Sequence, residues 1–344
     1  MGVSAVWGRL GLVVPGLCLA AIVAVSHGSA AAQSDRLDVV VTIKPVHSLV
    51  AQVMEGVGEP SLLIEGRASP HAFSLRPSDA KALNSADVVV RVGPSLEPFT
   101  VRLAETLGSE TTLVTLAEAP GVEVLQMRRG SRFEAHEHSD SHDHGHAETG
   151  QDDGHGHGDK DADDDVHAMG GLDAHIWLDP DNAKAIVRYI ANVLGSRRPE
   201  MKDKFSANAT KAIAAIDALD AEVRADIAPI VGKPFVVFHD AYQYFERHYG
   251  LQAAGAITLN PEVKPSARRL SEIRETLAET GASCVFAEPQ FSPRIVASVI
   301  EGSHAKAGTL DPLGADLPAG PDHYAALMRT LGKDMVACLG KSTG

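Results

Sequence analysis

The chain has few of the features that mark the commoner functional classes. Beyond its N-terminus, no stretch approaches the ~20 apolar residues that a membrane-spanning helix needs. Neither G-x-G-x-x-G nor G-x-x-x-x-G-K-[ST] occurs, and no basic cluster suggests a nucleic-acid ligand. There is no H-E-x-x-H motif of a zinc hydrolase either. With 44% hydrophobic and 22% charged residues, the chain is otherwise typical of a globular protein.

The N-terminus has the pattern of an export signal. Arg9 precedes an apolar run over residues 10–25, and three alanines at 30–32 supply small residues for cleavage. We expect residues 1–32 to be a signal peptide, with the mature chain beginning near Gln33; an uncleaved membrane anchor is the alternative. Cys18 follows Leu17 rather than a small residue, so lipid attachment is not expected.

Cysteine is scarce, with three residues in 344, and loss of the signal leaves only Cys284 and Cys338. In an oxidising compartment an even pair is more often bridged than free. Cys284 opens a predicted strand and Cys338 ends a predicted helix. We therefore expect a disulfide that fastens the C-terminal helix to a sheet, with two buried thiols as the alternative.

Most of the net charge of −14 lies in one segment. Residues 134–165 hold twelve Asp or Glu and one Lys, and the rest of the chain is close to neutral. Eight of the sixteen histidines lie in the same region and have no hydrophobic period around them: His136, His138, His142, His144, His146, His155, His157 and His167. Such a segment buries too little apolar surface to fold alone, so we predict a disordered loop over 132–169.

On either side of this loop, short apolar strands alternate with helices, as in parallel βα units. The predicted strands are 38–43, 61–64, 87–92, 111–115, 235–238, 253–259, 284–287 and 307–310. The predicted helices begin at Pro45 or cover 77–86, 98–107, 240–249, 266–280, 294–300 and 323–339. Residues 181–230 are helical in composition and are broken at Pro199. The prediction is two α/β lobes with parallel sheets, 36–198 and 231–344, joined by a linking helix over 199–230, with a cleft between them.

Three histidines outside the loop are candidate metal ligands. His71 follows a predicted strand, His239 directly follows the strand 235–238, and His175 lies between aspartates in D-A-H-I-W-L-D-P. Ligands of parallel α/β sheets collect at the carboxyl ends of strands, where Asp311 also lies. Neutral imidazole is the commonest zinc ligand, and three nitrogens with one oxygen complete a tetrahedral shell.

The motifs around these residues resemble one family. They are HAFSLRPSD at 71–79, HIWLDP at 175–180, VFHDAYQYF at 237–245, CVFAEPQ at 284–290 and GTLDPLG at 308–314. They look like the periplasmic zinc-binding subunit of bacterial high-affinity zinc ABC importers and cover nearly the whole mature chain. The resemblance implies two lobes tied by a rigid helix, Zn²⁺ held in the cleft by His71, His175 and His239, and a Cys284–Cys338 disulfide. It also implies that the His-rich loop separates zinc members from manganese members.

One position departs from the family pattern. Some zinc members have a glutamate immediately before the first histidine, and here Pro70 offers no side-chain ligand. The fourth ligand is then Asp311 or a water. Around the site, Asp173, Asp179 and Glu288 are candidates to accept a histidine ring N–H, although Asp179 before Pro180 equally suits a helix cap. No companion ligand is expected near His47, His248, His304 or His323, and all four are expected to be structural or exposed.

The resemblance implies a periplasmic, monomeric, non-enzymatic protein that captures Zn²⁺ for an inner-membrane ABC permease and its ATPase. An auxiliary periplasmic zinc chaperone is an optional further partner, and no nucleic acid is involved. The loop histidines are expected to hold additional zinc weakly and raise its local concentration; a merely solvated insert is the alternative. A manganese or iron importer subunit, a metal-binding adhesin of the same fold, and a zinc hydrolase are the competing functions.

Overall fold

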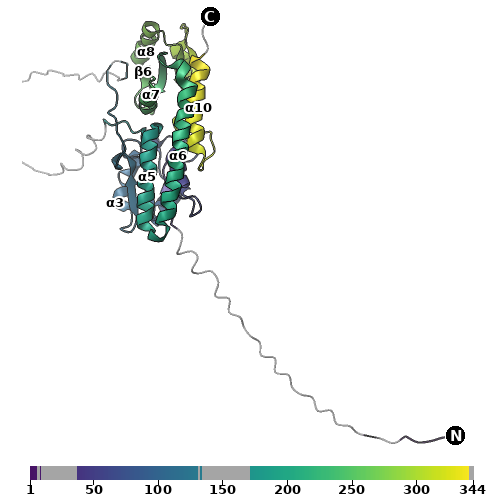
Figure 1. Ribbon diagram of the computed structural model, residues 1–344. Helices are drawn as coiled ribbons and strands as arrows, with labels where there is room; N and C mark the ends of the chain where they lie inside the picture. The colour runs from purple at the N-terminus through teal and green to yellow at the C-terminus, as the bar shows by residue number, and fades with distance from the viewer. Residues whose placement is uncertain (6–7, 9–36, 131, 134–170, 341–344) are drawn as a thin grey trace, which may run out of the picture. The chain divides into compact units, whose positions relative to one another are not determined.

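The computed structural model describes residues 1–5, 8, 37–130, 132–133 and 171–340 (Figure 1). The predicted signal peptide and the eight loop histidines therefore lie outside the described residues, apart from the first few positions of the signal. Residues 37–344 form one compact unit. Among its described helices, none combines the length and the apolar character required to span a bilayer.

The N-terminal lobe is built on a four-stranded parallel sheet in the order β2-β1-β3-β4. The strands are β1 (Val39–Val41), β2 (Ser61–Leu62), β3 (Val88–Arg91) and β4 (Thr112–Thr115). The two central strands are valine-rich and buried along their whole length, as expected for strands covered on both faces. The predicted parallel sheet is confirmed, with strands slightly shorter than predicted.

The C-terminal lobe repeats this plan with the order β6-β5-β7-β8. Its strands are β5 (Phe235–His239), β6 (Ala253–Thr258), β7 (Cys284–Ala287) and β8 (Lys306–Thr309). The chain reverses its winding direction between β5 and β7, and ligands of doubly wound sheets bind at the carboxyl ends of such neighbouring strands. His239 is the last residue of β5 and Glu288 directly follows β7, so the topology places both side chains at this point.

The helices of the N-terminal lobe are α1 (Lys44–Val53), α2 (Pro77–Ser85) and α3 (Leu103–Thr106). The prediction of one helix over 98–107 was wrong. A 3-10 turn (Pro98–Thr100) and the single-turn helix α3 replace it. Arg91 donates through Nη1 to the carbonyl oxygen of Thr100 (2.8 Å) and to its Oγ1 (2.9 Å), which engages the carbonyl that a continuous helix would use at this point.

The helices of the C-terminal lobe are α7 (Gln243–Tyr249), α8 (Ala267–Thr280), α9 (Arg294–Ile300) and α10 (His323–Leu339). Helix α7 begins at Gln243, three residues later than predicted. Ala241 N bonds back to the carbonyl of His239 (2.9 Å), and the Asp240 side chain is bound by Arg128, so residues 240–242 form a tight turn instead of a helical one.

Two long helices follow in the chain, α5 (Pro180–Arg197) and α6 (Lys202–Ile227), with the predicted break at Pro199, and α6 leads from the N-terminal lobe to the C-terminal sheet. At 1.5 Å per residue, the 26 residues of α6 span about 39 Å. Helix α6 packs along α5 and α10, as Figure 1 shows, and also contacts α1. One cluster of buried side chains runs from the N-terminal sheet through these helices into the C-terminal sheet, so the lobes share a core.

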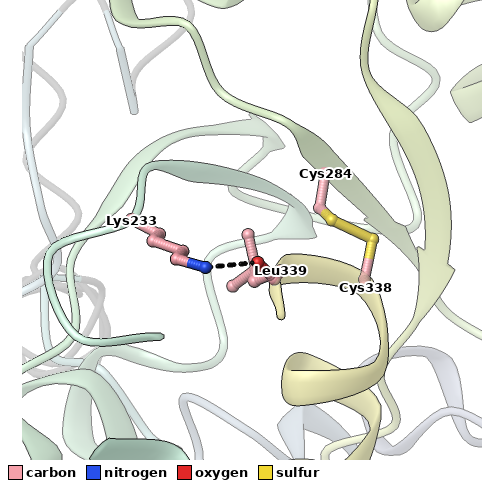
Figure 2. The surroundings of a disulfide bond; sticks show 4 residues. All are labelled: Lys233, Cys284, Cys338 and Leu339. Carbon is pink, nitrogen blue, oxygen red and sulfur yellow. Dashed lines mark hydrogen bonds between the residues drawn. A yellow bond between two sulfur atoms is a disulfide. The ribbon is translucent and has the colours of Figure 1, made fainter. Parts of the chain in front are cut away.

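The predicted disulfide is present. Cys284, at the start of β7, is bonded to Cys338, near the end of α10, with a Cα–Cα distance of 6.2 Å (Figure 2). Beside it, Lys233 Nζ donates to the carbonyl of Leu339 (2.9 Å) and caps the last turn of α10. The C-terminal helix is therefore held to the sheet covalently and by a charged hydrogen bond.

Removing this disulfide should destabilise the fold without weakening metal binding. The bridge closes a separation of 54 residues, for which chain entropy predicts about 4 kcal/mol. We expect the Cys284→Ser/Cys338→Ser double variant to lose about that much free energy of unfolding in urea, while its zinc affinity stays within about twofold of wild type. A zinc affinity that falls together with stability would contradict this separation of roles.

Candidate metal centre

The structure brings His71, His175 and His239 together from three parts of the chain. His71 lies on a 3-10 turn (Pro70–Ala72) after β2, His175 immediately precedes a 3-10 turn (Ile176–Leu178) leading into α5, and His239 ends β5. One ring nitrogen of each lies within 4.8 Å of the other two. The ring centroids are 5.1 to 5.7 Å apart. His71 was predicted to follow a strand end directly, but it lies nine residues beyond the end of β2.

Two carboxylates fix how two of these imidazoles are oriented. Asp173 Oδ1 lies 2.8 Å from Nδ1 of His175, and Glu288 Oε1 lies 2.6 Å from Nδ1 of His239. An ionised carboxylate only accepts, so each neutral ring carries its proton on Nδ1 and leaves its Nε2 lone pair free. The predicted roles of Asp173 and Glu288 as hydrogen-bond partners are confirmed.

The two free nitrogens face each other. Nε2 of His175 and Nε2 of His239 are 3.2 Å apart, and both side chains are buried. Two lone pairs at this distance repel unless a proton or a cation lies between them. In a tetrahedral site with Zn–N bonds of about 2.05 Å, neighbouring nitrogens are about 3.3 Å apart. The spacing therefore matches one edge of a zinc coordination tetrahedron.

The third imidazole, that of His71, is kept neutral by its surroundings. Burial, followed by the proximity of His239 and His175, lowers the pKa of His71 to about 2. For His239, burial also opposes the charged form, but the carboxylates of Glu288, Asp240 and Asp173 outweigh it and raise the pKa above its ordinary 6.5. A proton therefore competes with a metal at His239 far more than at His71.

The pocket that the three rings line is small and largely apolar. Its volume is about 10 Å³, which is room for one water-sized particle. The remaining lining residues are mainly apolar: Pro70, Leu96, Trp177, Phe291, Pro312 and Leu313, with Ser69, Gln290 and Glu288. A low-dielectric lining strengthens the attraction between a cation and its ligands. The geometry suits a single ion more than an organic molecule.

Asp311 lies outside this group. Among the described residues, the cluster of close potential ligands in the cleft consists of the three histidines. The Asp311 carboxylate accepts hydrogen bonds from Gln290 Nε2 (2.8 Å), Leu313 N (3.0 Å) and Ala315 N (2.6 Å). It shapes the turn that carries Pro312 and Leu313 to the pocket. Its predicted role as fourth ligand stays a prediction, and this geometry favours a water in that position.

Asp179 acts as a helix cap, the alternative considered for it. Its Oδ1 accepts from Asp181 N (2.7 Å) at the start of α5. The expectation that His248 has no companion was wrong, because Asp179, Asp181 and His248 form a second group of potential ligands. Helix α7 packs beside the 3-10 turn before α5, which brings these distant residues together. The two ring nitrogens of His248 contact Asp179 (3.1 Å) and Asp220 (2.9 Å).

The other histidines named above are structural or exposed, as expected. His47 Nε2 lies 2.9 Å from the carbonyl of Pro60, and both nitrogens of His323 contact backbone carbonyls at 2.9 Å. His304 is exposed. Sequence reasoning missed Arg128 and Tyr244, which contact residues next to the ligands. Arg128 lies outside every motif, and Tyr244 lies within the motif at 237–245, but nothing in that motif marks its hydroxyl as a contact of Asp173.

Comparison with known proteins places this site in a family. The chain matches the model of ZnuA, zinc-uptake complex component A periplasmic, over residues 39–338. A high-affinity zinc uptake system protein ZnuA from Brucella suis biovar 1 (strain 1330) is 48% identical over 310 residues, 89% of this chain and 93% of the relative. The protein of the same description from Paracoccus denitrificans (strain Pd 1222) is 44% identical over 323 residues, 93% of this chain and 97% of the relative.

Solved structures share the fold at lower identity. A crystal structure of ZnuA matches with a TM-score of 0.68 and 23% identity, covering 88% of this chain and 99% of that chain. The solute-binding protein FpvC from Pseudomonas aeruginosa, in complex with Mn²⁺, reaches 0.69 at 20% identity, covering 89% and 99%. These likenesses confirm the two-lobed architecture. With the family model spanning residues 39–338 and relatives 44–48% identical over most of both chains, this chain belongs to the family of periplasmic zinc-uptake components, ZnuA.

Proposed function

We propose that this protein captures Zn²⁺ in the cleft through His71, His175 and His239 and delivers it to an ABC transporter. The observation that carries the proposal is the pair of Nε2 atoms 3.2 Å apart, each ring held by a carboxylate on its Nδ1. The ion is cargo that must be released, so the protein acts in transport and is not an enzyme, in line with its family.

The donor set favours zinc over manganese. Imidazole nitrogen suits zinc and its neighbours, whereas manganese prefers carboxylate and other oxygen ligands. Three imidazoles meet in the pocket, and the two carboxylates nearest to them, Asp173 and Glu288, are engaged with ring nitrogens. A water in the fourth position completes the shell without Asp311. Competition between the two ions at pH 7 tests this order of preference.

The partners follow from the family. A periplasmic component of a zinc ABC importer works with a membrane permease and its ATPase. We further propose that the protein is a monomer, that residues 1–32 are a cleaved signal peptide, and that an auxiliary zinc chaperone is an optional partner. Mass spectrometry of protein isolated from the periplasm tests the first two: a monomer beginning near Gln33 is expected, and a retained N-terminus would exclude cleavage.

The fluorescence of Trp177 can be used to measure the proposed zinc binding. The sequence has two tryptophans, and Trp177 is the one in the described fold, with its ring 5.3 Å from that of His175 and in the lining of the pocket. Titration of the mature protein with zinc, in competition with a chelator, should change the Trp177 emission and saturate at one tightly bound ion. Failure of zinc to bind tightly at pH 7 would reject the proposed function, and turnover of ester or peptide substrates would favour a hydrolase.

The eight histidines of the segment 134–170 are proposed to hold additional zinc at lower affinity. A deletion should retain Arg132 and Phe133, which the predicted loop of 132–169 included but which belong to the fold. The Arg132 carbonyl accepts from Ala256 N (3.1 Å), and the Arg128 guanidinium lies 4.2 Å from the centre of the Phe133 ring.

Deleting 134–170 should remove only the weaker binding. Isothermal titration of the deletion variant should show the tight cleft site unchanged and the additional, weaker sites lost. A matched variant with the eight histidines replaced by serine separates imidazole binding from loop length. If the full chain already binds one zinc ion only, the segment is an inert solvated insert.

A further inference from the structure

One hydroxyl of the C-terminal lobe holds the two chain segments that flank residues 134–170. Leu125 N donates to Tyr244 Oη (2.9 Å), and that hydroxyl donates to the carbonyl of Asp173 (2.7 Å). The segments also pair with each other: Gln126 and Leu172 form an antiparallel bridge. Tyr244 lies on α7 and is 1% exposed, so these contacts are shielded from water. We call this arrangement, residues 125–128 and 171–173 with α7, the clasp.

The clasp connects directly to the first of the two facing imidazoles. Asp173 Oδ1 accepts from both the backbone N–H of His175 (3.0 Å) and its ring Nδ1 (2.8 Å). On the other side, the Gln243 amide, with its nitrogen turned inward, donates to Asp173 Oδ2 and to the Gln126 carbonyl, both at 3.1 Å. The first two residues of α7 thus hold the aspartate that orients His175.

The same segment connects to the second imidazole through a buried ion cluster. Arg128 Nε lies 3.0 Å from both carboxylate oxygens of Asp240, and Nη1 lies 2.7 Å from Glu246 Oε2. The side chains of Asp240 and Glu246 are 4% and 3% exposed, and that of Arg128 is 17% exposed. Asp240 directly follows His239. A buried, bidentate guanidinium is a rigid connection because neither partner can exchange it for water.

We propose that Tyr244 and Arg128 are positioning residues for the metal centre: they fix the separation between His175 and His239. This inference rests on the proposed function. His175 belongs to the chain that enters α5 from the N-terminal lobe, and His239 ends a strand of the C-terminal lobe. The clasp ties both to α7 immediately behind the pocket. The clasp therefore sets the 3.2 Å spacing between the two Nε2 atoms. This spacing favours an ion with tetrahedral coordination over an ion that prefers a larger number of ligands.

Two conservative substitutions test the proposal. Tyr244→Phe removes one oxygen and keeps the buried ring, and Arg128→Lys keeps the charge but cannot bridge both carboxylates in a fork. The control is Arg247→Gln on the same helix, where Arg247 forms an exposed ion pair with Glu123. The full mature chain is titrated with zinc against a chelator, and separately with Co²⁺, whose visible absorption is strong in four-coordinate sites and weak in six-coordinate ones.

We expect Tyr244→Phe and Arg128→Lys to lose about tenfold in zinc affinity, comparable to the loss of other outer partners of metal ligands. Their Co²⁺ bands should weaken or shift, and Arg247→Gln should match wild type. A Tyr244→Phe protein with wild-type affinity and an unchanged Co²⁺ spectrum would overturn the proposal. The proposal would also be overturned if partial unfolding of the metal-free variant accounted for its whole loss of apparent zinc affinity. Wild-type zinc binding by His239→Ala would instead remove the proposed function itself.

Discussion

Replacing His71 or His239 by alanine should abolish tight zinc binding. Each supplies one of three nitrogens, and loss of a direct ligand should cost more than the 10–100-fold that loss of an outer partner costs. We expect an increase in the dissociation constant of more than about 100-fold in either variant, measured by chelator competition with Trp177 emission as the signal. His304→Ala, at an exposed position, is the matched control and should bind as wild type.

The two variants differ in what they leave behind. His71 is half-buried and its ring stays neutral, so His71→Ala should keep the thermal midpoint of the metal-free protein. His239→Ala leaves the buried Glu288 carboxylate without its imidazole and should lower that midpoint. Retention of wild-type zinc affinity in a folded variant would remove that histidine from the site.

The second large effect is the dependence of zinc affinity on pH. Because the pKa of His239 is raised above 6.5, its ring binds a proton more readily than a free imidazole does and must lose it to bind metal. Affinity should be fully present above this raised pKa and should fall about tenfold for each pH unit below it. His71, with a pKa of about 2, adds no proton competition between pH 5 and 8. Chelator competition across that range measures the slope.

Glu288→Gln should move this pH profile in a defined direction. The amide oxygen still accepts from Nδ1 of His239, but the negative charge that raises the pKa is gone, so the onset of zinc loss shifts to lower pH. At a pH high enough for the ring to be neutral in both proteins, the affinity of the variant should be about 10–100-fold weaker because the ligand is less basic. Glu301→Gln, at an exposed position, is the control. An unchanged profile would show that Glu288 does not govern the protonation of His239.

Local patterns were sufficient to predict the strands and most helices. Valine-rich runs such as β3 are buried on both faces, and such runs are compatible with few structures other than central parallel strands. The break at Pro199 and the pairing of Cys284 with Cys338 were predictable because proline ends helices and only two cysteines lie beyond the predicted signal peptide. The three histidines could be chosen as candidates because His239 ends a strand and all three lie in the family motifs, and their joint role as zinc ligands stays a prediction.

Hydrogen bonds and ion pairs between distant residues were not predictable. Helix α7 begins late because Arg128, 112 residues away, binds Asp240, and residues 98–107 are interrupted because Arg91 reaches the Thr100 carbonyl. Asp311 follows a strand like a ligand, yet local backbone N–H groups of its own turn occupy its oxygens. Position along a strand predicts which edge of the sheet a side chain occupies, but not which partner it contacts there.

The central claim is that His71, His175 and His239 bind one zinc ion together. A crystal of the zinc-loaded protein, measured on either side of the zinc absorption edge, locates the ion independently of any affinity. We predict one strong anomalous peak in the cleft, about 2.0–2.1 Å from a ring nitrogen of each histidine. An empty cleft, with zinc found only elsewhere, for example between Asp179 and His248, would contradict the account.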